Sequence, residues 1–180
     1  MAQLKELLIE ELQDLLFAET QLTKALPEMA AAAHNPKLKE AFTKHLAQTE
    51  GQIERLHKAF ELLGTKATPK QCKAMLGLIG EGKERIKETQ GQDELTADLA
   101  LIGAAQKVEH YEISGYGTVR GIARLINEKQ VAKLLDHTLG EEESADFLLT
   151  TIAEPILQHA SMQELGASKE DLKLVATSTR

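Results

Sequence analysis

Four stretches of this chain repeat apolar residues at helical spacing and then place an acid where the next apolar residue is expected. In the first stretch Leu12 and Leu15 lead to Glu19, after which Leu22 resumes the apolar stripe. The acids that interrupt the other three stripes are Glu50 and Glu54, Glu109 and Glu112, and Glu143 and Asp146. An unpaired carboxylate in a protein interior costs several kcal/mol, so four such interruptions need a shared explanation. Bound metal ions supply one.

The same periodicity predicts an all-α fold. Ala, Leu, Glu, Lys and Gln dominate the chain, and long runs of alternating β-branched residues are absent from it. The pattern predicts four long helices, over residues 4–33, 36–63, 93–126 and 128–153. Pro27 is expected to kink the first of these helices. Pro155 is expected to break or kink the last, with a short C-terminal helix following as far as Leu165.

The lengths of the connections predict the topology. Short links join the first helix to the second and the third to the fourth, so each pair is expected to be antiparallel. The long connection over residues 65–93 carries an apolar stripe of its own and predicts a crossover helix, which its glycines could divide into two pieces. This is the ferritin-like four-helix bundle with one long crossover. Residues 1–165 are expected to form the bundle and residues 166–180 a tail.

Composition excludes several classes of protein. The chain has 21 basic and 28 acidic residues and six aromatic ones, with no basic cluster interleaved with aromatics, which disfavours nucleic-acid binding. No run of 18 uncharged apolar residues occurs, so no membrane span is expected. The single cysteine, Cys72, excludes an internal disulfide, and the amino terminus lacks the pattern of a secretory signal. We therefore expect a cytoplasmic protein.

The acids suit a site for two metal ions. Such sites in helical bundles take one Glu from each of two helices and a Glu-x-x-His motif from each of the other two. Glu19 and either Glu109 or Glu112 are candidates for the single positions, and Glu54 with His57 forms the full motif. Glu143 and Asp146 have the spacing of the second motif, with Asp in place of His. In this run of three glutamates, a register shifted by one residue would make Glu142 the ligand instead.

The charge of the acids and the type of the ligands narrow the choice of ligating residues and of metal ions. The seven acids would carry more negative charge than two divalent ions neutralise, so either some are not ligands or the site favours a more highly charged, oxidised pair. Glu50 is the candidate for a supporting rather than a ligating role, with bridging as the alternative. Ligation dominated by carboxylates points to Fe first and Mn second. Asp146 has an alternative role as a hydrogen-bond acceptor.

Two residues near these acids are predicted to support ligands instead of binding metal. His110 adjoins Glu109 and therefore points elsewhere around the helix. Tyr116 lies one turn after Glu112 and could hydrogen-bond a ligand, although such a tyrosine is also a common core residue. The remaining histidines are interpreted as surface or capping residues: His34, His45, His137 and His159.

Beyond this constellation, the chain resembles the bacterial YciE/YciF-type stress proteins of the ferritin-like superfamily, over about residues 1–160. The segments that carry the resemblance are residues 10–15 with Ala18 and Glu19, residues 51–55, residues 104–113, Thr138 with Leu139, and residues 141–143. The resemblance implies a helical bundle, a homodimer and a rubrerythrin-like metal site. It implies no reaction. The chain departs from rubrerythrin-like proteins at Asp146, where they have His, and it lacks a cysteine-rich electron-donor domain.

Three hypotheses for function follow. In the first, two Fe or Mn ions are bound in the bundle and are oxidised by O₂ or remove peroxide, in an oxidative or general stress response. In the second, a non-catalytic stress or structural protein uses its metal site only to stabilise the bundle. In the third, the bundle is an interaction module whose buried acids are partly protonated and bind no metal.

Overall fold

The computed structural model describes residues 2–165 of the chain, and side-chain surroundings as far as residue 162. The expected tail, residues 166–180, lies outside the described residues. The five helices are α1 (Ala2–Ala32), α2 (Pro36–Leu63), α3 (Lys73–Glu88), α4 (Glu94–Leu125) and α5 (Lys129–Leu165). No strand occurs among residues 2–165, so the predicted all-helical bundle is confirmed.

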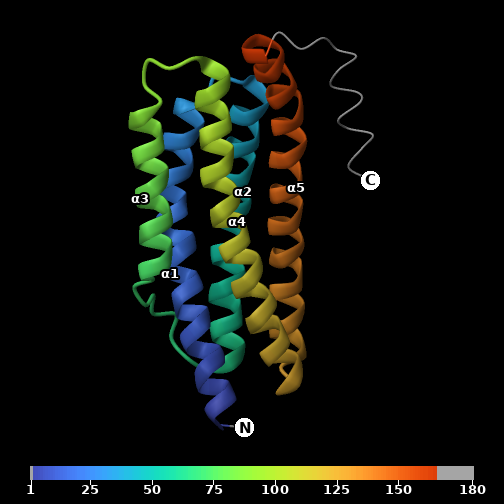
Figure 1. Ribbon diagram of the computed structural model, residues 1–180. Helices are drawn as coiled ribbons and strands as arrows, with labels where there is room; N and C mark the ends of the chain where they lie inside the picture. Colours follow the sequence, from blue (N-terminus) through green and yellow to red (C-terminus); the bar gives the residue numbers. More distant parts are fainter. Residues whose placement is uncertain (1, 166–180) are drawn as a thin grey trace.

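The long helices stand side by side, and the shorter α3 covers one flank of the bundle next to α1 and α4 (Figure 1). Following the chain, α1 and α5 run in one direction, whereas α2 and α4 run in the other. The parallel pair α2 and α4 requires a connection that returns along the whole bundle, and α3 with its flanking loops provides it. This is the single long crossover that the connection lengths predicted.

Local signals explain where α2 begins and ends. The side chain of Asn35 accepts hydrogen bonds from the backbone N–H groups of Lys37 and Leu38, and Pro36 occupies the first helical position. At the other end Gly64 adopts a left-handed conformation, with φ of 71°, and closes the helix. The predicted bounds of this helix are confirmed.

Neither of the two internal prolines ends its helix. Pro27 lies within α1 and Pro155 within α5, and each helix continues on both sides. The expected separate C-terminal helix is therefore the last part of α5. Both prolines are on exposed faces, where a carbonyl that has lost its N–H partner can bond to water.

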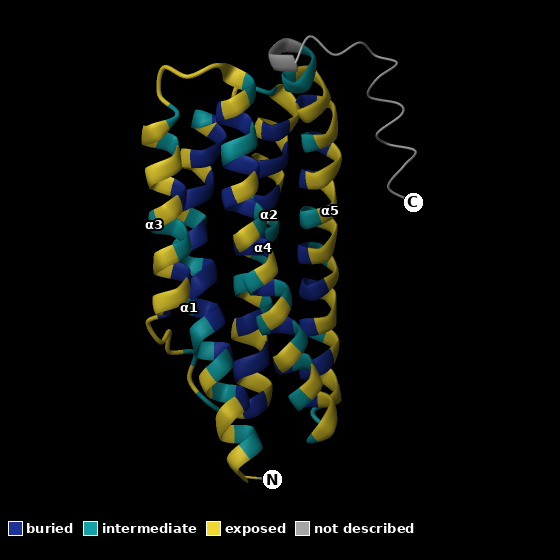
Figure 2. Ribbon diagram, viewed as in Figure 1, coloured by how far each residue is buried: buried dark blue, intermediate teal, exposed yellow. Residues whose placement is uncertain are grey.

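The apolar core is divided into two clusters, one toward each end of the bundle. One cluster contains Leu22, Phe42, Leu101 and Leu149, and the other contains Leu12, Leu56, Tyr116 and Leu135. On α2, α4 and α5 the chain passes from one cluster to the other across a short run of buried polar residues. Figure 2 shows the buried positions along the inner faces of the helices. The polar layer between the two clusters is therefore closed off at both ends by hydrocarbon.

Candidate metal centre

Four glutamates are buried in the polar layer. Glu19 comes from α1, Glu109 and Glu112 from α4, and Glu142 from α5. Glu19, Glu112 and Glu142 have no exposed surface, and Glu109 is 3% exposed. The heptad-like spacing of their helices explains this burial, because each glutamate continues the same face as the apolar residues before and after it.

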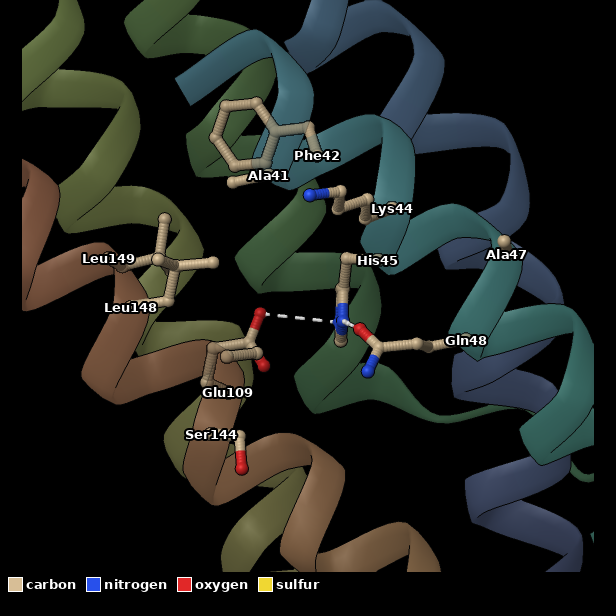
Figure 3. A pocket seen from close by; sticks show the side chains of 11 residues that line it. Ala41, Phe42, Lys44, His45, Ala47, Gln48, Glu109, Ser144, Leu148 and Leu149 are labelled. Carbon is tan, nitrogen blue, oxygen red and sulfur yellow. Dashed lines mark hydrogen bonds and ion pairs between the residues drawn. The ribbon is translucent and has the colours of Figure 1, made fainter. Parts of the chain in front are cut away.

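Helix α2 contributes three neutral or weakly basic side chains to the layer. His45, Thr49 and Gln52 are buried between Phe42 and Leu56 of the same helix. His45 was interpreted from sequence as a surface or capping residue, and this interpretation is wrong. Its side chain points toward the bundle interior, and its Nε2 lies 3.4 Å from Oε1 of Glu109 (Figure 3). The same nitrogen lies 3.5 Å from Oε2 of Glu142.

Four of these residues converge closely enough to bind one ion together. One potential ligand atom from each of His45, Glu109, Glu112 and Glu142 lies within 4.8 Å of the others. Glu19 adjoins this group, since its charge raises the pKa values of both Glu109 and Glu112. The converging donors are thus three carboxylates and one imidazole, from α2, α4 and α5, with the buried Glu19 of α1 as a further candidate.

Neighbouring side chains hold two of the carboxylates in place. The hydroxyl of Tyr116 donates a hydrogen bond to Oε1 of Glu19, and Nε2 of Gln52 donates one to Oε1 of Glu142. Gln52 also donates to Oε2 of Glu141 at 3.1 Å, and Arg55 bonds to that same oxygen. Nε of Arg55 donates to the hydroxyl of Thr138 at 2.9 Å. These contacts leave the inner oxygens of the glutamates free.

Several buried polar atoms in the layer have no hydrogen-bond partner in the protein. They include Oε2 of Glu19, Nε2 of His45, Oε2 of Glu109, both oxygens of Glu112 and Oε2 of Glu142, together with Oγ1 of Thr49 and Oε1 of Gln52. A buried acceptor without a donor is costly, and so many on one small centre are unusual. A cation would be a partner for the carboxylate oxygens and the imidazole nitrogen among them. The residues present therefore fit a carboxylate-rich metal site.

Burial raises the pKa of every carboxyl in the layer. The pKa values of Glu19, Glu112 and Glu142 lie well above 4.5, and that of Glu109 rises to about 8. Desolvation is the largest cause for each, and neighbouring carboxylates add to it. Without cations Glu109 therefore retains its proton at neutral pH, and a bound metal would displace it.

Five residues predicted as ligands do not enter the layer, and one of them, Asp146, is partly exposed. Glu50, Glu54, His57 and Glu143 are exposed to solvent. The prediction that these side chains point inward is therefore wrong. Glu142, the alternative left open by the sequence, occupies the buried position on α5. The predicted Glu-x-x-His motif at Glu54 and His57 lies on the outer surface of α2.

The reason for the α2 error is geometric. A step of four residues overshoots one helical turn by about 40°, so the series Leu38, Phe42, Leu46, Glu50 drifts around the helix. The buried face instead alternates steps of four and three, and continues from Phe42 through His45, Thr49 and Gln52. This alternation of steps predicts that His45 and Gln52 are buried.

Of Asp146 and the two residues that were predicted as supports for ligands, one lies in the layer and two lie outside it. Tyr116 is fully buried against Glu19, as its predicted supporting role requires. Asp146 is partly exposed and accepts a hydrogen bond from Nε2 of Gln106 at 3.0 Å. His110 is exposed, with its Nε2 3.4 Å from Asp146. These two residues form a surface pair outside the buried cluster.

Fold and site together define a helical-bundle protein with a buried, carboxylate-rich centre. The chain belongs to the family described as "Domain of unknown function (DUF892)", which matches residues 3–162. It is 44% identical over 154 residues to Protein YciF of Escherichia coli K12, across 85% of this chain and 92% of the relative.

Solved structures agree with this assignment. The crystal structure of the E. coli stress protein YciF matches with a TM-score of 0.83 and 43% identity, covering 88% of this chain and 99% of that one. A putative structural protein from Rhodopseudomonas palustris, YcfI, matches with a TM-score of 0.78 and 39% identity, covering 82% of this chain and 93% of that one. A Xanthomonas campestris protein shares the fold at 24% identity, with a TM-score of 0.66 over 88% of this chain and 99% of that one.

None of the five helices in residues 2–165 combines the length and the apolar character that crossing a bilayer requires.

Proposed function

We propose that this protein binds two transition-metal ions, Fe first and Mn second, in the polar layer of its bundle. The observation that carries the proposal is a set of buried carboxylate oxygens from three helices that make no hydrogen bond, beside His45, whose Nε2 makes none either. Glu19, Glu109, Glu112 and Glu142 would carry four negative charges when ionised, which two divalent cations neutralise. Oxygen-rich ligation with a single imidazole suits Fe or Mn better than Cu or a structural Zn.

We further propose that the bound ions react with O₂ or peroxide, in keeping with the description of the E. coli relative as a stress protein. When bound, the ions would supply the electrons that reduce the oxidant. The chain's own residues prepare the site. Gln52 and Tyr116 orient Glu142 and Glu19, and the two apolar clusters cover the layer toward each end of the bundle. A homodimer and a cytoplasmic location, both expected from sequence, remain part of the proposal.

A second function is supported by the description of the R. palustris relative as a putative structural protein. In this alternative the ions only offset the charge of the buried carboxylates and hold the four helices together. Both functions predict that metal raises the melting temperature. Only the first predicts oxidation.

Anaerobic loading with Fe²⁺ followed by mixing with O₂ or peroxide distinguishes the two. The first function predicts rapid growth of ferric absorbance with wild-type protein, and loss of that phase in Glu112→Gln, since this variant removes an acid with two unpartnered oxygens. Glu54→Gln is the matched control because Glu54 is exposed on the outer face of α2. Oxidation no faster than in buffer, with metal still raising the melting temperature, would favour the structural alternative.

A further inference from the structure

A cavity of about 410 Å³ lies between α2 and α5, beside the polar layer. Its walls are mainly hydrocarbon, from Ala41, Phe42, Ala145, Leu148 and Leu149, and it is partly open to solvent. Figure 3 shows the apolar side chains of α2 and α5 facing each other across this space. The volume is within the range of about 300–1,000 Å³ that is typical of pockets for small organic molecules.

The inner end of the cavity belongs to the candidate metal centre. His45 and Glu109 line the cavity and are also members of the converging ligand group. Both side chains are almost completely buried from solvent, although they face this space. A molecule in the cavity would therefore lie with one end against the metal ligands and the rest of its length against hydrocarbon.

The metal ligands at the inner end of the cavity and its hydrocarbon walls together indicate which class of small molecule it binds. A peroxide with no carbon would fill only a small part of this volume, and it would gain nothing from apolar walls. Hydrocarbon would leave water and contact Phe42, Leu148 and Leu149, a gain of about 25 cal/mol for each Å² of apolar surface buried. We propose that the cavity binds the hydrocarbon part of an organic hydroperoxide, ROOH, with its peroxide group directed toward His45 and Glu109.

This inference rests on the proposed function, since the hydroperoxide would be the oxidant for the bound metal. Two ferrous ions held by the buried carboxylates would supply the two electrons that cleave the O–O bond, and both would become ferric. The alkoxy oxygen and the hydroxyl oxygen each take one proton from solvent. The products are the alcohol ROH and water, so one turnover of a fully reduced site needs no further reductant.

Binding is tested in the full-length, metal-free protein with cumyl alcohol, the unreactive product of cumene hydroperoxide. Titration followed by amide NMR should give saturable shifts at residues of α2 and α5 around the cavity. Leu148→Gln should weaken the affinity about tenfold, because it places an amide in an apolar wall. Leu157→Gln is the matched control, since Leu157 is also exposed on α5, at 54% against 43% for Leu148, and lies outside the cavity lining.

Kinetics of the Fe²⁺-loaded protein supply the second measurement. Leu148→Gln should slow oxidation by cumene hydroperoxide about tenfold and leave oxidation by hydrogen peroxide unchanged, since only the organic oxidant uses the apolar wall. No saturable shifts in the wild type, or equal effects of the two variants on binding, would overturn the inference. Equal slowing with both peroxides would also overturn it while leaving the proposed function intact. If the protein binds cumyl alcohol but takes up no metal when Fe²⁺ is added, the proposed function is wrong.

Discussion

Among single residues, the clearest distinction is between two adjacent glutamates of α5. Glu142 is completely buried and has an unpartnered oxygen facing His45, whereas Glu143 is exposed. Their chemistry is identical, so any difference between them arises from orientation alone. Gln52 adds to the difference because it holds Glu142 in place through a buried hydrogen bond.

We predict that Glu142→Gln loses at least one of the bound ions, because an amide is a much weaker and uncharged ligand. Glu143→Gln should keep the wild-type stoichiometry. Calorimetric titration of the metal-free proteins with Mn²⁺ or anaerobic Fe²⁺ measures the metal stoichiometry of both variants. Full metal binding by Glu142→Gln, or equal losses in the two variants, would exclude Glu142 as a ligand.

How far single residues could be predicted depended on the register of each helix. Glu19, Glu109 and Glu112 are predicted candidates that the structure places in the buried layer, since the apolar stripes of α1 and α4 alternate steps of three and four around them. His45 was missed because a histidine among apolar residues carries no sign of its partners. Those partners, Glu109 and Glu142, lie more than 60 residues away in sequence and meet His45 only in the folded bundle.

At the scale of the helices, Asp98 of α4 fixes the turn between α1 and α2. Its carboxylate accepts hydrogen bonds from the backbone N–H groups of His34 at 2.8 Å and Asn35 at 2.7 Å. Asp98 is itself 2% exposed. The contact ties the start of α2, and hence the position of His45 three turns later, to α4, which carries Glu109 and Glu112.

We predict that Asp98→Ala lowers the free energy of unfolding by about 2 kcal/mol, because it leaves two backbone donors without their acceptor. Glu94→Ala, one turn earlier on α4, removes an exposed contact with His34 at 3.9 Å and one negative charge from the first turn of the helix, and should cost less than about 1 kcal/mol. Urea denaturation of both variants gives the comparison. An equal effect of the two substitutions would contradict the role assigned to Asp98.

Helix bounds could be predicted well because their causes are local. Asn35, Pro36 and Gly64 act on their immediate neighbours in the chain, so α2 could be placed without the rest of the fold. The effect of Pro155 was less predictable, because a proline on an exposed face can be accommodated within a helix held by its neighbours. Cys72 also gave no signal of its capping role, in which its sulfur accepts from the N–H of Met75.

For the molecule as a whole, the buried carboxyls have two effects on stability. A rise in pH lowers the stability of the metal-free protein, and bound metal raises it. In the metal-free fold the pKa of Glu109 is raised from 4.5 to about 8, and those of Glu19, Glu112 and Glu142 are raised in the same direction. The folded state therefore holds more protons than the unfolded state above pH 4.5. The stability that these four groups contribute is greatest below that pH and is lost as the pH rises toward 8.

We predict that the metal-free protein has a lower free energy of unfolding at pH 8 than at pH 5, measured by urea denaturation. Exposed carboxyls with lowered pKa values, such as those of Glu40 and Glu81, finish titrating below this window and do not obscure the trend. Glu109→Gln should reduce the slope, and Glu143→Gln should not. A metal-free protein that becomes more stable between pH 5 and pH 8 would contradict the burial of these acids as ionisable groups.

Metal content is the most direct test of the idea that cations neutralise the acids at the centre of this bundle. Elemental analysis of the wild-type protein, purified without chelators and compared with Glu142→Gln prepared identically, gives it in one measurement. We predict about two Fe or Mn ions per wild-type chain, as in other carboxylate-bridged bundles, and fewer in the variant. Wild-type protein that holds almost no metal and melts at the same temperature before and after chelation would contradict the account.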